Sequence, residues 1–115
     1  MAREQLQTLS EPMYFILLAL TKPMHGYDIM QTITAISQNR VTVGAGTLYA
    51  LLKRFEKEGI VRQIDDDGRR KTYAITPKGR ELLDREYSRL KKSISAYDSY
   101  IDYIAKEREG THCER

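Results

Sequence analysis

The spacing of apolar residues predicts a helical domain built from three short helices. Helical periodicity indicates helices over residues 11–20, 27–37 and 46–58. The first of these is apolar nearly all round, so it must be buried on most sides. In the third, apolar residues recur at positions 48, 51, 52 and 55, which is the i, i+3, i+4, i+7 pattern of an amphipathic helix. Its other face holds small and basic residues, and this face is free to contact a partner.

A β-hairpin is predicted directly after the third helix. Gly59 is a helix stop, and the stretches 60–64 and 69–75 contain strand-like residues. The four residues 65–68, three aspartates and a glycine, have the chemistry of a tight turn. The aspartates are expected on the solvent side of the hairpin tip. A helix followed by such a hairpin predicts a mainly α fold with a small β-hairpin, of the winged helix-turn-helix type.

A long helix is predicted from Thr76-Pro77 to Arg108, because threonine can cap a helix and proline fits its first turn. Over 32 residues this helix would be about 48 Å long at about 1.5 Å per residue, whereas a compact domain of this size has a radius of gyration of only ~13 Å. Its apolar positions follow each other in alternating steps of about four and three residues, as in a heptad seam. The seam comprises Leu83, Tyr87, Leu90, Ile94, Tyr97, Ile101 and Ile104.

A seam that the chain itself cannot cover implies a second chain. We therefore expect a homodimer whose interface includes Leu90, Ile94, Tyr97, Ile101 and Ile104. The alternative is that the long helix folds back on the helices of its own domain. The predicted organisation is a winged-helix DNA-binding domain over residues 1–76, a C-terminal dimerisation helix over 77–109 and a disordered tail over 110–115.

Composition limits the function classes further. In 115 residues no apolar run approaches the ~20 residues that cross a bilayer, and the N-terminus lacks the layout of a signal peptide. A cytoplasmic protein without a membrane partner is expected. Cys113 is the single cysteine, so no internal disulfide is possible, and with His112 it provides too few ligands for a metal site. His25 has no nucleophile near it in sequence, and no phosphate-binding loop is present; neither an enzyme nor a cofactor is expected.

Positive charge is concentrated in the third helix and the hairpin. The net charge is only +3, but residues 40–80 contain ten Lys/Arg against five Asp/Glu, while the rest of the chain contains nine against eleven. An ordinary solvated surface is one explanation. The other is contact with nucleic acid, since lysines and arginines neutralise phosphates while small residues let a helix approach base edges.

Four segments in order make the chain resemble the PadR-type transcriptional regulators, a winged-helix family. The first segment comprises residues 16–20 (ILLAL) and 23–29 (PMHGYDI). The other three are 46–49 (GTLY), 52–61 (LKRFEKEGIV) and 68–79 (GRRKTYAITPKG). One departure is Ala50, where the family usually has proline after the tyrosine. The single C-terminal helix resembles the small subgroup of the family, in which one long helix builds the dimer.

The resemblance implies a homodimeric, sequence-specific repressor that binds double-stranded operator DNA with two recognition helices and two wings. Two-fold symmetry would make the operator a pseudo-palindrome. The residues that the resemblance assigns to DNA contact are Tyr27, Thr47, Tyr49, Lys53, Arg69, Arg70 and Lys71. The alternative is a winged-helix dimer that acts as a protein-interaction or assembly module without reading an operator.

The resemblance also suggests an effector. In small members of the family, an aromatic-lined space between the first and last helices of the dimer takes planar drugs. Aromatic side chains and methionine suit such flat ligands. The tentative effector-binding residues are Met13, Tyr14, Tyr97 and Tyr100, with Phe15 and Tyr103 nearby in sequence. The alternative is that these residues form only the core of the dimer.

Overall fold

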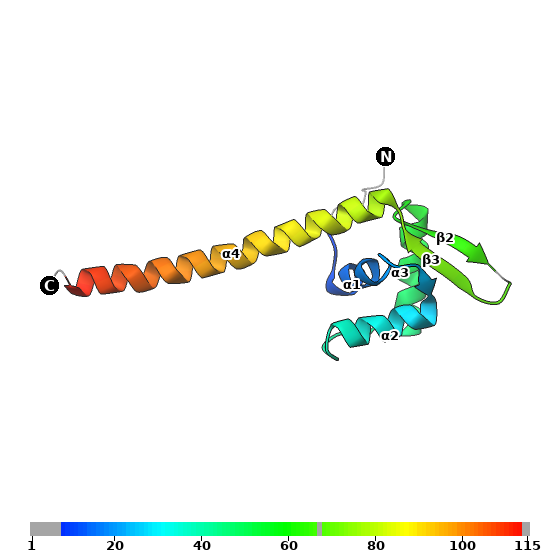
Figure 1. Cartoon of the computed structure of the whole chain (residues 1–115), viewed down its shortest axis with the longest axis horizontal. Helices are drawn as coiled ribbons and strands as arrows, with labels where there is room; N and C mark the ends of the chain where they lie inside the picture. The colour runs from blue at the N-terminus through cyan, green and yellow to red at the C-terminus, as the bar shows by residue number, and fades with distance from the viewer. Residues whose placement is uncertain (1–7, 67, 114–115) are drawn as a thin grey trace.

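The computed structural model describes residues 8–66 and 68–113 (Figure 1). It consists of a small winged domain from which one helix projects. The elements in chain order are α1 (Glu11–Ala19), β1 (Met24–His25), α2 (Gly26–Ile36), α3 (Ala45–Lys57), β2 (Val61–Asp66), β3 (Lys71–Ile75) and α4 (Pro77–Cys113). The mainly α fold with a small β-hairpin is confirmed. No helix in the described ranges is long and apolar enough to cross a membrane.

The helix α1 begins as its sequence predicts. Ser10 is the N-cap, and its Oγ accepts a hydrogen bond of 3.4 Å from the Met13 N–H. Pro12 lies in the first turn, where its missing N–H leaves no bond unmade. The helix packs against both α2 and α4. Phe15, Ile16 and Leu17 are therefore buried, as the apolar sequence on most sides of this helix predicts.

The turn between α2 and α3 is held by one buried serine. Ser37 Oγ donates to the Val41 carbonyl at 3.2 Å and accepts from the Val41 N–H at 3.0 Å. Gln38 and Asn39 lie in the left-handed region at φ 56° and 67°, which Asn tolerates better than most residues. Val41 and Val43 then enter the core. This predicted loop is thus an ordered connection that sets where α3 begins.

The sheet has three antiparallel strands in the order β1-β3-β2. The strand β1 was not predicted, because two residues are too few to show an alternating pattern. It pairs with β3 through Met24↔Tyr73 and His25↔Thr72. This pairing connects the hairpin to the start of α2, so the wing is anchored on both sides of β3.

Both strands of the hairpin have bounds that differ from the prediction. The strand β2 continues to Asp66, so Asp65 and Asp66 are strand residues and not turn residues; Asp67 lies outside the described residues. Cross-strand pairing of Asp65 with Thr72 and Asp66 with Lys71 outweighs the poor strand propensity of aspartate. The strand β3 begins at Lys71 and not at residue 69. Arg69 and Arg70 therefore lie in the tip loop, where strand alternation does not apply.

A β-bulge interrupts the pairing of β2 with β3. Gln63 pairs with Tyr73, and the next pair is Asp65 with Thr72, so Ile64 is the extra residue. Bulges increase the local twist and bend the strand that contains them. The bulge lies between the buried base of the hairpin and its exposed tip, and so it contributes to the direction in which the tip points.

One side chain connects the end of α3 to the start of α4. Thr76 Oγ1 donates to the carbonyls of Gly59 at 2.6 Å and Ile60 at 3.0 Å, and it accepts from the Gly79 N–H at 3.0 Å. Lys78 Nζ donates to the Glu58 carbonyl at 2.9 Å. The carbonyls that follow α3 are thus satisfied by the residues that begin α4. A Cβ on Gly79 would collide with the Ile60 carbonyl oxygen, so only glycine allows this close approach.

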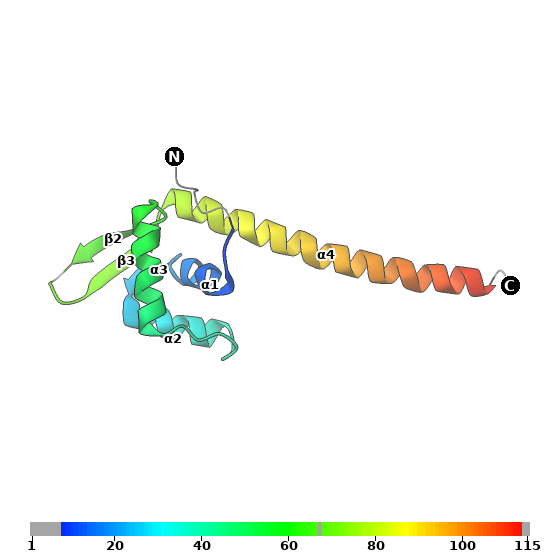
Figure 2. The ribbon, with the colours of Figure 1, turned by 180° about the vertical axis from the view of Figure 1, so that it is seen from behind.

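The helix α4 leaves the domain and continues as a rod (Figures 1 and 2). It has 37 residues, and it reaches Cys113, within the stretch 110–115 that was expected to be a disordered tail; residues 114–115 lie outside the described residues. Leu82 and Leu83 in its first turns are buried in the domain. The radius of gyration is 19.6 Å and the longest dimension is 75 Å, so the helix does not fold back on its own domain.

Glu86 is a buried carboxylate on α4, only 5% exposed. Two hydrogen bonds from Arg89 and one from the Leu9 backbone N–H favour its charged form. The hydrogen bonds of Arg89 and its positive charge lower the pKa of Glu86 against the opposing effect of burial. This contact fastens the segment before α1 to α4.

We expect Gly79→Ala to destabilise the domain by about 1–3 kcal/mol, because the new methyl group must displace the Ile60 backbone. Gly46→Ala is the matched control, since a Cβ there meets nothing within 4 Å, and it should stabilise α3 by up to ~1 kcal/mol. Urea unfolding at a fixed protein concentration measures both variants. Equal effects of the same sign would refute the close approach of Gly79 to Ile60.

We expect Glu86→Gln to lower the free energy of unfolding at pH 7 by about 1 kcal/mol, since the charged hydrogen bonds are weakened. The folded pKa of Glu86 lies below the unfolded one, so its stabilisation is complete above the ordinary value of about 4.3 and disappears as pH falls through the folded pKa. The difference between wild type and variant should therefore shrink below about pH 4 in urea unfolding curves. A difference that does not change with pH would contradict the assignment.

Candidate nucleic-acid interface

The outer face of α3 is exposed, and Tyr49, at the border with α2, is its one large exposed ring. Leu48, Leu52 and Phe55 fix the inner face in the core. Thr47, Ala50 and Lys53 are exposed on the other face, with Arg54 and Lys57 further along. Arg54 donates to Glu58 at 3.0 Å, one turn later. The face therefore offers small residues at its N-terminal end and positive charge towards its C-terminal end.

Gly46 lies in the first turn of α3, and the fold does not require a glycine there. A Cβ at this position would meet nothing within 4 Å, and the backbone is not in the left-handed region. Glycine in a helix costs about 0.8–1 kcal/mol relative to alanine. The bare backbone at Gly46 thus has no explanation inside the chain, whereas a closely approaching partner would explain it.

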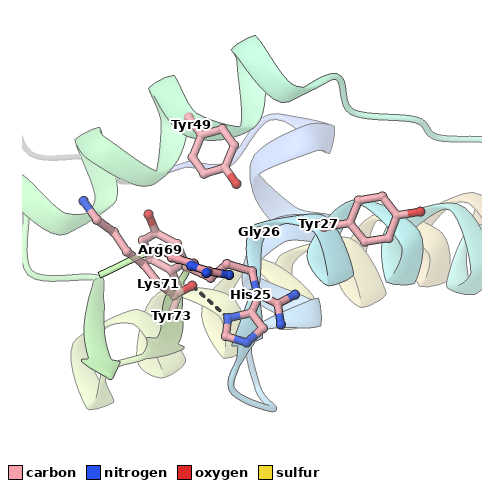
Figure 3. A pocket seen from close by; sticks show the side chains of 8 residues that line it. His25, Gly26, Tyr27, Tyr49, Arg69, Lys71 and Tyr73 are labelled. Carbon is pink, nitrogen blue, oxygen red and sulfur yellow. Dashed lines mark hydrogen bonds between the residues drawn. The ribbon is translucent and has the colours of Figure 1, made fainter. Parts of the chain in front are cut away.

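Tyr49 packs over the start of α2. A Cβ on Gly26 would collide with the Tyr49 hydroxyl, so the ring lies directly against the glycine backbone (Figure 3). Tyr49 is still 47% exposed, and it lies at the border between α2 and α3. Tyr49 therefore has a packing role in addition to any contact with DNA, and this role was not foreseen from the sequence.

The wing brings three basic residues to the same border. Arg69, Arg70, Lys71 and Tyr73 line a cavity of about 300 Å³. His25, Gly26 and Tyr27 from β1 and α2 and Tyr49 from α3 line the same cavity. Five of the seven predicted DNA-contact residues thus border one pocket. Thr47 and Lys53 lie on α3 outside it.

Tyr27 is a surface residue at the start of α2, 63% exposed. Figure 3 shows its ring pointing away from Tyr49 and His25. The first turn of α2 has no side-chain cap bond from its N-cap residue His25, so the N–H groups of this turn receive no acceptor from that side chain. Tyr27 is therefore placed beside a helix terminus that favours negative charge.

No DNA-contact role was expected for His25 from the sequence, but it lines this pocket. Its Nδ1 lies 3.2 Å from the Lys71 carbonyl oxygen and 3.3 Å from Thr72 Oγ1. The signal in the sequence was its place in the segment Met24-His25-Gly26-Tyr27, but its partner in β3 is 46 residues away. No group of three or more possible metal ligands occurs among the described residues.

The tentative effector-binding residues do not meet within one chain. Met13 and Tyr14 are half-buried on α1, whereas the part of α4 that contains Tyr97 and Tyr100 projects away from the domain (Figure 2). Phe15 makes an edge-to-face contact with Tyr14 at 5.6 Å between ring centroids and belongs to the core. Tyr103 donates to Glu107 at 3.4 Å on the same helix. Any shared aromatic space would require a second chain.

Comparison with known proteins agrees with this geometry. The sequence profile of the transcriptional regulator PadR-like family matches residues 16–85. A transcriptional regulator from Clostridium thermocellum has the same fold, with a TM-score of 0.63, 24% identity and coverage of 75% of this chain and 88% of the other. The protein therefore belongs to the PadR-like family of transcriptional regulators, with a winged helix-turn-helix DNA-binding fold.

Two relatives in sequence have no stated role. One is a 37.1 kDa protein in transposon TN4556 of Streptomyces fradiae, 37% identical over 91 residues, which are 72% of this chain and 26% of that protein. The other is protein X of Lysinibacillus sphaericus, 32% identical over 87 residues, which are 70% of this chain and 80% of that protein. The chain matches about a quarter of the length of the Streptomyces fradiae relative.

Proposed function

We propose that the protein is a homodimeric repressor that binds operator DNA through α3 and the β2–β3 wing. The observation that carries this proposal is the pocket shared by α2, α3 and the wing, because it brings three basic side chains of the wing next to α3, the helix proposed to read the DNA. Together with the open face of α3 they form one continuous surface. Such a surface suits a helix in the major groove with a basic wing on the adjacent backbone. A protein with this role works in the cytoplasm, where the DNA is.

Each residue has a proposed role. Thr47 and the bare backbone at Gly46 approach base edges, because neither presents bulk on the outer face of α3. Lys53 and the wing residues Arg69, Arg70 and Lys71 neutralise phosphates. The hydroxyls of Tyr27 and Tyr49 donate to phosphate oxygens at the start of α2.

Dimerisation is proposed from the exposed apolar stripe of α4. Ile94, Tyr97 and Ile101 are 63%, 67% and 46% exposed in the single chain, and Leu90 and Ile104 flank them. Burying one such side chain is worth about 1.5–3 kcal/mol. A second α4 laid along the stripe would remove it from water, and the two winged domains would then be held at a fixed separation.

We further propose that a small aromatic effector binds between the two chains and releases the DNA. Met13 and Tyr14 on α1 and Tyr97 and Tyr100 on α4 carry the aromatic and thioether groups for a flat ligand. Because one chain keeps these two sets apart, the site would exist only in the dimer. Such a ligand could then change the angle between the subunits.

The DNA-binding proposal predicts a steep dependence on salt. Duplex DNA from the protein's own promoter should bind with a log–log salt slope of several units, since counterions are released. Lys53→Ala and Arg70→Ala should each weaken binding about fivefold to tenfold and lower the slope by about one. Gly46→Ala should weaken binding although it stabilises the fold, while Lys106→Ala, far along α4, should leave binding unchanged.

Fluorescence anisotropy over a salt series measures these effects. Weak binding of the wild type that is equal for all sequences and insensitive to salt would refute the proposal. That outcome would favour a dimer that serves as a protein-interaction or assembly module.

The dimer proposal predicts that Ile94→Asp together with Ile101→Asp yields a monomer, because two charges would be buried in the seam. Ser95→Asp, on the outer side of the same helix, is the matched control and should remain dimeric. Analytical ultracentrifugation gives the mass of each species. The monomer should also fail to bind a planar aromatic dye, which fluorescence would measure. If the variant with both charges is still a dimer, pairing along the apolar stripe of α4 is refuted.

A further inference from the structure

The wing is connected to α2 by few contacts. The strand β1 has only two residues, and each has a single partner in β3. Beyond this pairing, the hairpin extends away from the domain towards its tip (Figure 1). A two-residue pairing is a weak restraint on a hairpin that must place three cations with respect to α3. An additional contact at this position therefore has a large influence on the wing.

His25 supplies that contact. Its Nδ1 lies 3.2 Å from the Lys71 carbonyl oxygen and 3.3 Å from Thr72 Oγ1, at the beginning of β3 next to the tip loop. A carbonyl oxygen can only accept a hydrogen bond, so the bond to Lys71 forms when Nδ1 carries a proton, and Thr72 Oγ1 is then a second acceptor beside it. Since the side chain of His25 bonds to Lys71 while its backbone pairs with Thr72, the residue holds two successive positions of β3.

These positions lie directly after Arg69 and Arg70. The three basic side chains and His25 line the same cavity of about 300 Å³, opposite the Tyr49 ring that packs on Gly26 (Figure 3). The cavity thus combines guanidinium and ammonium groups with a tyrosine hydroxyl and the start of a helix. Charged donors of this kind bind phosphate oxygens strongly, and guanidinium groups do so in bidentate geometry.

We propose that His25 is a positioning residue of the DNA interface: through Nδ1–H it fastens the beginning of β3 to the start of α2, so that this pocket receives one phosphate group of the DNA backbone. The proposal rests on the proposed DNA-binding function. It adds a specific residue and a specific pocket to it. In this arrangement His25 acts on the phosphate through the wing, and Arg69, Arg70 and Lys71 make the contact.

The amide nitrogen of asparagine is separated from Cα by the same number of bonds as Nδ1 of histidine, whereas that of glutamine is one bond further away. His25→Asn can therefore keep the hydrogen bond to the Lys71 carbonyl, and His25→Gln cannot. We expect His25→Gln to weaken binding of promoter duplex about fivefold, the effect of losing one hydrogen bond. It should also lower the salt slope, because a phosphate is no longer fully neutralised. His25→Asn should bind as the wild type does.

A second measurement does not depend on DNA. Imidazole ¹⁵N NMR of the full-length wild type should show the proton on Nδ1, and amide spectra should show changes around Lys71 and Thr72 in His25→Gln but not in His25→Asn. A proton on Nε2 alone, or unchanged wing amides in His25→Gln, would refute the contact. Thermal unfolding of both variants shows whether a loss of binding is a loss of fold.

The two proposals fail in different ways. If the wild type binds no DNA in a salt-dependent manner, the proposed function and the phosphate pocket are both overturned, while NMR still decides the contact of His25 with the wing. If the wild type binds DNA and Lys53→Ala weakens it, but His25→Gln binds normally, only the role of His25 is overturned. If His25→Asn and His25→Gln lose the same amount of affinity for the promoter duplex, the role of His25 through Nδ1 is likewise overturned.

Discussion

The fold depends on the contact between the end of α3 and the beginning of α4. Thr76 satisfies the carbonyls of Gly59 and Ile60 and at the same time caps α4 through the Gly79 N–H. Because Gly79 has no side chain, the two helix ends approach as closely as their backbones allow. The end of α3 is therefore attached to the start of α4 by the side chains of Thr76 and Lys78 and by the close backbone approach at Gly79.

This attachment determines what pairing along the exposed stripe of α4 would do to α3. If two chains pair along α4, the separation of their α3 helices follows from the junction at Thr76 and not from the wings. A rotation between the two α4 helices would then change the distance between the reading helices. The proposed site for an effector, which needs α1 of one chain and α4 of the other, lies where such a rotation would be controlled.

Much of the fold could be predicted from local pattern. The periodicity of the short helices, the cap at Ser10 and the heptad steps of α4 depend on residues close in sequence. The strand β1, the bulge at Ile64 and the buried Glu86 could not be predicted in the same way. The strand β1 needs Tyr73 and Thr72, and Glu86 is bonded by Leu9 as well as by its neighbour Arg89, so both depend on partners far along the chain. The bulge depends on the register between two strands, which the residue pattern does not show.

The site shows the same division. The positive charge at residues 69–71 and on α3 was evident, because charge is a property of each residue alone. That Tyr49 packs on Gly26, and that His25 bonds to Lys71, depends on how α2, α3 and the hairpin are arranged. Sequence pattern could therefore indicate which residues contact DNA, although nothing in it indicated which residue orients them. Those assignments to DNA contact stay predictions.

The glycines distinguish what the fold needs from what a partner needs. A side chain at Gly26 or Gly79 would collide with the chain itself, so these two glycines are explained by packing. Gly46 has open space around it and an ordinary helical backbone, and alanine would be the better residue for the stability of α3.

The exposed stripe of α4 likewise lowers the stability of the isolated chain, because it leaves apolar surface in water. Both features lower the stability of a single chain, and both become favourable once a surface from outside the chain covers them. The two surfaces lie on different elements, α3 and α4, and they match the two partners proposed above, a DNA groove for the first and a second copy of the chain for the other.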